Sequence, residues 1–418
     1  MFPYGDTIVS DRDRAVIRFA AIQLFVLIYL EKLGSGPVSL SIVLMTAHLA
    51  WMLVSRQLTV SRIRLGLYLG MCGLCIFSEA LTVGSVLSVT ELLVVCSFLT
   101  VEAEITETSY ERILSIFINL MIVPALIVLA QYGYQRFTGR ADPINMNNLL
   151  PASVLLQGYI YDAHYPWYSS FSRPNGFFLL EPSVASMLTA SAAIIEVTYF
   201  RRLSIITLMV SATFLSLGGT GITMLLVAVP FLLARESARL ASASAILGIV
   251  ALVIAVSAGA ELPLLSRMSE LHQQGSSGSG RLLVPSLSIV AYAFDPTYFF
   301  TGTGAGSITG SDGAAWPLLK LTKEYGLLAA LMFASLYLTA CGGRFNLALK
   351  VSLSIIFNFA SGSLLSPHGV PCLMLLFTLC RPVALNLLPQ GPQSEMRWPR
   401  QSEQPGRITG ATTMPVAR

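Results

Sequence analysis

Long apolar segments alternate with short polar ones along most of the chain. A helix needs about 17 to 25 apolar residues to cross a bilayer, where it must satisfy its own backbone hydrogen bonds. About twelve segments approach this length, and some are short enough to be merged, tilted or re-entrant. They lie near residues 15–30, 38–54, 65–77, 85–99, 114–132, 183–200, 203–217, 220–234, 240–258, 327–341, 346–364 and 370–385. The pattern predicts an all-α polytopic membrane protein.

The composition supports this fold class and excludes others. Hydrophobic residues make up 54% of the 418 residues, only 11% are charged, and the mean hydropathy is +0.69. A soluble domain carries about 25% charged residues, and disordered, collagen-like or coiled-coil chains need polar or strictly periodic compositions. The net charge of +4 is therefore no indication of a nucleic-acid partner.

Arginines in the short loops predict the orientation, because Arg and Lys are retained on the cytoplasmic side during insertion. With twelve spans they all fall on one side, and both termini are then cytoplasmic. These arginines are Arg12, Arg14, Arg18, Arg56, Arg62, Arg64, Arg201, Arg202, Arg235, Arg239, Arg344 and Arg381. The first apolar segment has no cleavage site of the usual kind, so we expect it to stay as a signal anchor.

The predicted organisation has two long loops on the non-cytoplasmic side. In chain order, we expect five helices, the first long loop, helices six to nine, the second long loop, helices ten to twelve, and a disordered cytoplasmic tail. The boundaries are 1–132, 133–182, 183–258, 259–326, 327–385 and 386–418. Long loops are often functional, so candidate chemistry is sought there.

Each long loop contains an arginine beside an apolar segment. Arg173 lies in Ser-Arg-Pro-Asn-Gly, and Arg281 lies in Gly-Ser-Gly-Arg-Leu. A guanidinium donates two parallel hydrogen bonds to a phosphate and keeps its charge, so both could bind a lipid phosphate. The alternative is snorkelling toward lipid headgroups. Aromatic residues such as Trp167 could anchor the loop at the membrane surface or stack on sugar rings.

Other polar positions leave two interpretations open. Glu181 precedes Pro182 and could be either an acidic residue at a helix start or a base or sugar ligand. The run Gly302-Thr-Gly304-Ala-Gly306 lacks the Lys-Ser/Thr of a P-loop, so it is either an anion-binding turn or a plain flexible one. The four histidines are scattered, and no metal site is predicted.

Three stretches resemble the Wzy-type polysaccharide polymerases of bacterial inner membranes, which are related to the O-antigen ligases. The first runs from Arg173-Pro-Asn-Gly to Glu181-Pro-Ser. The second is Ser-Gly-Arg281-Leu followed by the glycine-rich run, and the third is Lys-Glu324-Tyr-Gly-Leu-Leu. Ligases carry a histidine shortly before the last element, and this chain has none there, which favours a polymerase.

The resemblance implies a glycosyltransferase of GT-C-like fold in the inner membrane. It would join undecaprenyl-pyrophosphate-linked oligosaccharide repeat units into an exopolysaccharide, at the periplasmic face and without a metal or other cofactor. Arg281 and Arg173, with Arg267 as a helper, would hold the departing pyrophosphate, and Glu181 would position the acceptor or take its proton. Gly302, Gly304 and Gly306 would allow close approach to the lipid carrier, and Glu324 and Trp167 would contact substrate.

Two alternatives remain at this stage. An O-antigen ligase would share the chemistry and differ in its acceptor, and a twelve-helix transporter or flippase would move the lipid-linked sugars instead. Transporters usually show two related halves, which are not visible here. Expected partners are membrane lipids and, in the same pathway, a chain-length regulator and a flippase.

Overall fold

Most of the described chain is helical. The computed structural model describes residues 10–82, 84–140, 145–159, 164, 171–236, 295–308, 316–342, 347–355, 357–358, 363–366 and 368–382. The helices are α1 (Asp11–Tyr29), α2 (Leu40–Val54), α3 (Arg62–Thr82), α4 (Val86–Ser97), α5 (Glu107–Thr138), α6 (Pro182–Ile195), α7 (Leu203–Leu215), α8 (Gly219–Glu236), α12 (Thr297–Phe300), α13 (Pro317–Tyr325), α14 (Leu327–Cys341), α15 (Leu347–Ile355) and α16 (Gly369–Leu373). A helix stands in every predicted apolar segment except 240–258, which lies outside the described residues.

Helix length and surface chemistry are those of an α-helical membrane protein. Among the described residues, three helical stretches are long and apolar enough to cross a bilayer: α3, α5, and α6 extended by a π-helical turn to Phe200. Only 17% of the most apolar stretch of α3 is buried within the protein, and its exposed face carries Ile63, Leu69 and Phe77. An apolar face left uncovered by protein is suited to contact with lipid. The expected total of twelve spans stays a prediction.

A short three-stranded sheet joins segments that the sequence analysis assigned to a loop and to a helix. Strand β4 (Val101–Ile105) pairs antiparallel with β3 (Thr59–Val60) and parallel with β5 (Cys380–Pro382). Burial alternates along β4, because Val101, Ala103 and Ile105 face inward while the two glutamates between them do not. This two-residue period is a strand signal within a stretch that was expected to be irregular.

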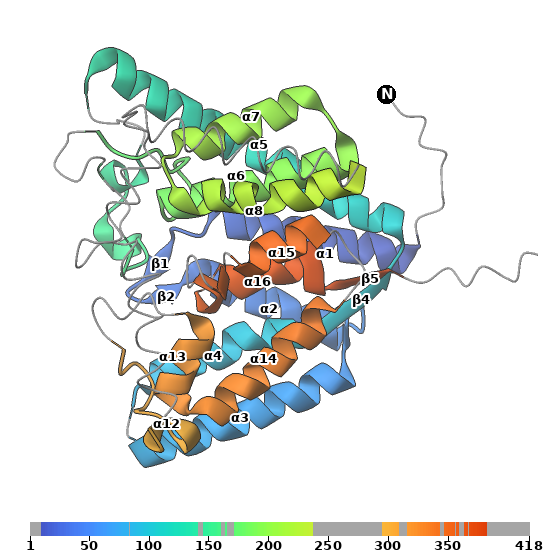
Figure 1. Cartoon of the computed structure of the whole chain (residues 1–418), viewed down its shortest axis with the longest axis vertical. Helices are drawn as coiled ribbons and strands as arrows, with labels where there is room; N and C mark the ends of the chain where they lie inside the picture. The colour runs from blue at the N-terminus through green and yellow to red at the C-terminus, as the bar shows by residue number, and fades with distance from the viewer. Residues whose placement is uncertain are drawn as a thin grey trace, which may run out of the picture. The chain divides into compact units, whose positions relative to one another are not determined.

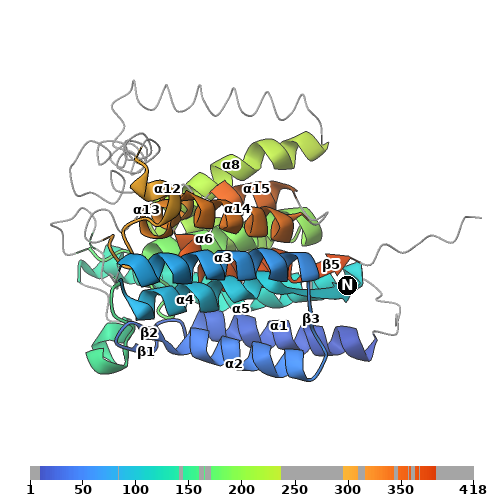
Figure 2. The ribbon, with the colours of Figure 1, turned by 90° about the horizontal axis from the view of Figure 1, so that it is seen from below.

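Figures 1 and 2 show this sheet at one end of the helices. We call that end the sheet end. At the opposite end lie β1 (Gly34–Ser35), β2 (Val38–Ser39), α12 and α13, and we call it the loop end. The arginines of the predicted cytoplasmic loops that precede α1 and α3 lie toward the sheet end. Described residues of the two predicted long external loops, 171–181 before α6 and 297–300 in α12, lie toward the loop end.

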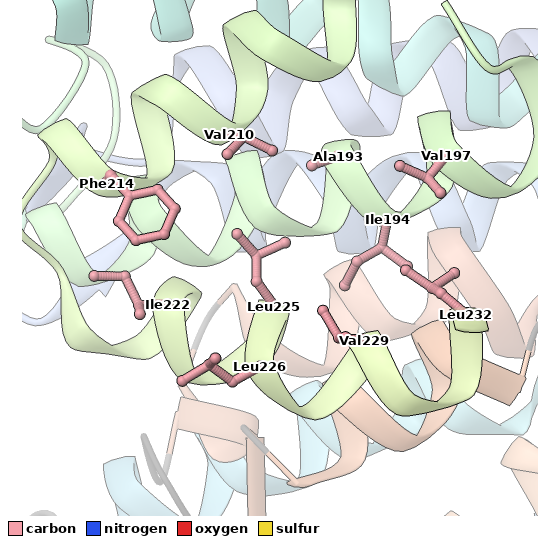
Figure 3. Close-up of a pocket in the computed structure, with 10 residues that line it drawn as sticks. All are labelled: Ala193, Ile194, Val197, Val210, Phe214, Ile222, Leu225, Leu226, Val229 and Leu232. Atoms are coloured by element: carbon pink, nitrogen blue, oxygen red, sulfur yellow. The ribbon is translucent and has the colours of Figure 1, made fainter. Parts of the chain in front are cut away.

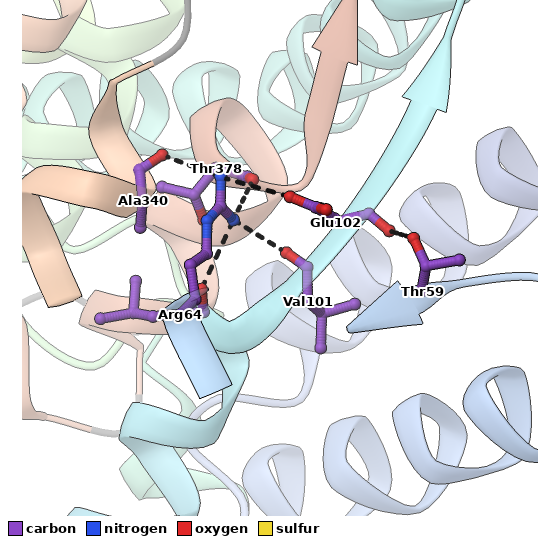
Figure 4. A network of polar contacts seen from close by, with 7 residues as sticks. Thr59, Arg64, Val101, Glu102, Ala340 and Thr378 are labelled. Carbon is purple, nitrogen blue, oxygen red and sulfur yellow. Dashed lines mark hydrogen bonds and ion pairs between the residues drawn. The ribbon is translucent and has the colours of Figure 1, made fainter. Parts of the chain in front are cut away.

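Buried Arg64 forms hydrogen bonds to several elements of the sheet end (Figure 4). Its guanidinium donates to the carbonyl oxygens of Val101 at 3.1 Å, Thr378 at 3.0 Å and Ala340 at 3.3 Å. These carbonyls belong to β4, to the π-helical turn after α16, and to the last turn of α14. Helix C-termini leave carbonyls without intrahelical partners, so one arginine satisfies groups on several elements.

Helix α6 is central and almost wholly buried, in contact with α5, α7 and α8. Ser186 on α6 donates to the carbonyl of Gly218 at 2.7 Å and accepts from the amide of Gly221 at 3.0 Å. A Cβ on Gly221 would clash with the Ser186 carbonyl oxygen, so only glycine fits. Small residues that let helices approach closely are typical of membrane interiors.

Candidate active site

Two glutamines on α5 hold the segment that contains Arg173. The Gln135 side chain pairs with the backbone of Ser172, donating to its carbonyl at 2.8 Å and accepting from its amide at 2.8 Å. One turn earlier, the Gln131 side chain accepts from the amides of Asn175 at 3.2 Å and Gly176 at 2.9 Å. All of these groups are buried, where such hydrogen bonds are costly to lose.

Arg173 lies between these two anchors. Its backbone is fixed on both sides, and the residue as a whole is only 9% exposed. Burial of a guanidinium costs free energy, so a buried arginine is a candidate for binding an anion. The structure therefore places the first predicted arginine on a rigid support at the loop end.

The turn that follows Arg173 has unusual backbone geometry. Gly176 has φ +71°, and Phe177, with φ 67°, adopts a conformation that is uncommon for an aromatic residue. The Asn175 side chain accepts from the Phe177 amide at 3.0 Å and helps to hold this turn. A Cβ on Gly176 would lie 3.1 Å from the Pro124 carbonyl oxygen of α5. Strained backbone that the surroundings maintain is a frequent feature of functional sites.

Glu181 lies at the start of α6, which was one of the two interpretations that the sequence left open. Its carbonyl accepts from the amides of Val184 and Ala185, and Pro182 occupies the first helical position. The carboxylate does not cap the helix but accepts from the Ser183 hydroxyl at 3.0 Å. It is partly exposed at the loop end, so its position allows contact with a ligand.

The glycine-rich turn packs between α13 and the ends of α3 and α4. Thr303 and Gly304 donate their amides to the carbonyls of Lys323 and Glu324 at 2.8 and 3.0 Å. The Ala305 amide donates to the Glu79 carboxylate of α3 at 3.1 Å. The turn is thus bound on two sides by the protein.

Packing explains the three glycines. Gly302, Gly304 and Gly306 all have left-handed backbone, with φ of 65°, 94° and 72°. A Cβ on Gly302 would lie 2.5 Å from the Lys323 carbonyl oxygen, and one on Gly304 would lie 2.8 Å from the Thr82 hydroxyl. The space beside these glycines is filled by the chain itself, so the predicted approach to a lipid carrier is not needed to account for them.

Glu324 has a comparable internal role. It is 1% exposed, and its carboxylate accepts from the amides of Gly306 and Ile308. Burial raises the pKa of this carboxyl, and the charge of Lys320 and the two amides offset only part of that rise. Among the described residues, nothing donates a hydrogen bond to its Oε1. Glu324 stabilises the turn, and a role in substrate binding stays a prediction.

The sequence analysis missed several polar residues of the loop end. These are Gln131, Gln135 and Glu79, together with Glu31 at the end of α1 and His368 before α16. The two glutamines could have been found, because amide side chains four residues apart on an apolar helix share one face. Glu31 and His368 are far apart in the sequence, and only the fold brings them together.

Other predicted site residues are not placed by the structure. Arg267, Arg281 and Trp167 lie outside the described residues. Within the residues that are described, no group of three or more His, Cys, Asp or Glu side chains could hold a metal ion.

An apolar cavity of about 310 Å³ lies between α6, α7 and α8 (Figure 3). Every side chain that lines it is hydrophobic, including Ile194, Phe214 and Leu225. A sugar or phosphate would find no hydrogen-bond partner there, because these side chains have no polar atoms. The cavity is thus separate from the candidate site.

A comparison with protein families shows which family the chain belongs to. The model of a family described as WcaD colanic acid polymerase matches residues 16–311, well over half of the chain. The match confirms the resemblance to Wzy-type exopolysaccharide polymerases on which the sequence analysis relied. No curated protein and no solved structure matches the chain.

Proposed function

Because the chain belongs to the WcaD colanic acid polymerase family, we propose that it joins undecaprenyl-pyrophosphate-linked repeat units at the periplasmic face of the inner membrane. The family is described as one of colanic acid polymerases, and polymerisation of an exopolysaccharide is a glycosyltransferase-type reaction. The product would be a polymer related to colanic acid. Its substrates would enter laterally from the bilayer, since both carry a lipid.

In the proposed reaction, a hydroxyl of one lipid-linked unit attacks the anomeric carbon of another. The bond from that carbon to the diphosphate breaks, and the electron pair leaves with the lipid diphosphate. Groups that meet this developing charge lower the barrier more than groups that bind substrate and transition state equally. Arg173, together with Arg281 and Arg267, would supply the positive charge, so no metal or other cofactor is needed.

The observation that carries the proposal is the buried support of Arg173. Gln131 and Gln135 fix the backbone on either side of it. An arginine with a fixed backbone is suited to binding a leaving diphosphate. A positive charge that is in place before the reaction stabilises the transition state without rearrangement of the site. Glu181 lies seven residues after Pro174, at the start of α6. From there it would contact the acceptor sugar.

Substitution of Arg173 tests the proposal. R173A should abolish polymer while single lipid-linked repeat units accumulate on the outer leaflet. R173K should keep a small part of the activity, because it restores charge but not the two parallel donors. Q135L, which frees Ser172, should lower the rate by on the order of tenfold without abolishing it. T138A, an exposed position on the same helix, is the control.

Leaflet-resolved labelling of the repeat unit separates polymerase from flippase. A flippase defect would leave the repeat unit on the cytoplasmic leaflet. Normal long-chain polymer from R173A at normal protein level would overturn the role of Arg173. Glycan transfer to a non-repeat acceptor by the purified protein would favour a ligase instead.

A further inference from the structure

Two buried ionisable groups lie next to each other at the loop end. The ring Nδ1 of His368 is 3.0 Å from Oε1 of Glu31, and the two side chains are 5% and 1% exposed. Glu31 follows α1, and His368 immediately precedes α16. The pair thus joins the first described helix to the last.

The surroundings of Glu31 differ from those of a structural carboxylate. In the described part of the chain, neither of its oxygens accepts a hydrogen bond, and the His368 ring lies 3.0 Å from one of them. Asp13, by contrast, accepts from Ser10, Thr106 and Ser109. A buried carboxylate with one histidine as its partner is costly for the fold, and such groups are candidates for function.

The pair lies beside the elements that carry the candidate site. The segment just before His368, 363–365, packs against α13 and α4, and α16 packs against α1. Tyr29, two residues before Glu31, makes an edge contact with the ring of Phe178 at 4.8 Å between centroids. Phe178 follows the Arg173 turn, and α13 carries Glu324, so neighbouring residues link the pair to both of these elements.

We propose that His368, backed by Glu31, accepts the proton of the acceptor hydroxyl during sugar transfer. The inference rests on the proposed function, and it assigns proton removal to His368, which leaves Glu181 to position the acceptor. As the hydroxyl oxygen bonds to the anomeric carbon, its proton passes to Nε2 of His368. The anomeric carbon–diphosphate bond breaks with its electron pair on the diphosphate, which Arg173 binds. The histidine then releases the proton to water.

The geometry fits this role. The Glu31 carboxylate, 3.0 Å from Nδ1, favours a proton on that nitrogen, which leaves the lone pair on Nε2, and it stabilises the imidazolium once it forms. The Ser366 hydroxyl lies 3.2 Å from Nε2 and 3.3 Å from Nδ1. Ser366 is partly exposed, so in the proposal an incoming hydroxyl replaces the Ser366 hydroxyl beside Nε2. Low exposure of the ring itself limits hydrolysis of the donor by water.

Other ionisable groups stand on the elements packed around His368. They are Lys32 after α1, Glu91 on α4, Lys320, Lys323 and Glu324 on α13, and Cys372 on α16. Within the described residues, Glu31 is the only acidic group within 4.0 Å of the ring. A change in the pH dependence on mutation of Glu31 or His368 would therefore report this pair.

The test uses the full-length protein in vesicles with purified lipid-linked repeat units, and it measures the initial polymerisation rate against pH. H368Q should lower kcat about 100-fold with little change in KM, since a base contributes roughly 10² to 10⁴ to a rate. If His368 is the base, the wild-type rate should rise with pH, and H368Q should lack this rise. E31Q should lower kcat about tenfold, and imidazole should partly restore H368A. H48Q is the control, a partly buried histidine on α2 that pairs with Gln23.

The outcomes separate this inference from the proposed function. H368Q at normal level with a wild-type rate and pH profile would overturn the role of His368, whatever Arg173 does. If H368Q is unstable, the imidazole response of H368A decides, because a purely structural histidine would not be replaced by a free ring in solution. No polymer from the wild type, or full activity of R173A, would instead overturn the proposed function.

Discussion

At the scale of single residues, Arg64 does more for the fold than its place in a predicted cytoplasmic loop indicated. Its guanidinium donates to carbonyls of four elements, including Leu99 of the 3-10 helix Phe98–Thr100, and lies 4.0 Å from the Glu102 carboxylate. The sequence analysis used Arg64 only as a marker of orientation. A buried arginine with carbonyl partners is a structural residue whose removal leaves several acceptors without donors.

We therefore expect R64A to destabilise the protein strongly. The loss should be on the order of 3 kcal/mol, because the carbonyls of Val101, Ala340 and Thr378 lose charged hydrogen bonds in a buried place. The thermal unfolding midpoint in detergent should fall by several degrees. R62A, two residues earlier and exposed, is the matched control. Equal midpoints for the two variants would contradict the structural role.

The lowered pKa of Asp13 predicts that the stability of the protein depends on pH. Burial alone would raise the pKa of its carboxyl, but hydrogen bonds from Ser109, Ser10 and Thr106 together hold it below the ordinary value. A carboxyl with a lowered folded-state pKa stabilises the protein above its unfolded pKa of about 3.9. That stabilisation is lost as the pH falls through the lower folded-state value.

Unfolding midpoints of the wild type and D13N should accordingly differ most near neutral pH. The difference should shrink as the pH is lowered below about 4. D11N is the control, since Asp11 has an almost fully exposed side chain in a surface ion pair with Arg14. If the difference in unfolding midpoint between the wild type and D13N does not change with pH, the charge of Asp13 does not stabilise the protein.

At the scale of elements, the glycine-rich turn is a packed connector rather than a loose one. Backbone bonds to α13, the Ala305 bond to Glu79, and the amides held by Glu324 fix it on several sides. Gly326, with φ +90°, allows α13 to meet α14 where a Cβ would lie 2.7 Å from the Phe300 backbone. The motif in the sequence thus encodes the geometry of the loop end.

Alanine at Gly302 should disrupt the turn, and Gly36 provides a control that isolates backbone strain. Both have positive φ, at 65° and 61°, but a Cβ at Gly36 meets nothing within 4 Å. G36A should cost about 1 kcal/mol from strain alone. G302A adds a clash with backbone atoms of α13 and should cost clearly more, seen as a lower midpoint and less folded protein. A G302A midpoint equal to that of G36A would contradict the packing.

At the scale of the whole molecule, hydropathy predicted where the helices lie because burial in lipid imposes one requirement on every span. It did not predict β4 or β5, since short strands at helix ends depend on pairing between segments far apart in the chain. Arg173 and Glu181 were visible as motifs, while Gln131 and Gln135 lay within an apolar helix. The contact between Glu31 and His368 depends on tertiary structure, which spacing along the sequence does not report.

Orientation is the last prediction, and it concerns the two ends of the molecule. If the loop end faces the periplasm, an impermeant maleimide added to intact spheroplasts should label S153C, which is exposed there. S55C, exposed after α2 near the sheet end, should react only after permeabilisation. Described native cysteines are buried or partly buried, so a background measurement on the wild type is required. The reverse pattern would place Arg173 in the cytoplasm, where no outer-leaflet repeat unit could reach it, and the proposed reaction would have no site.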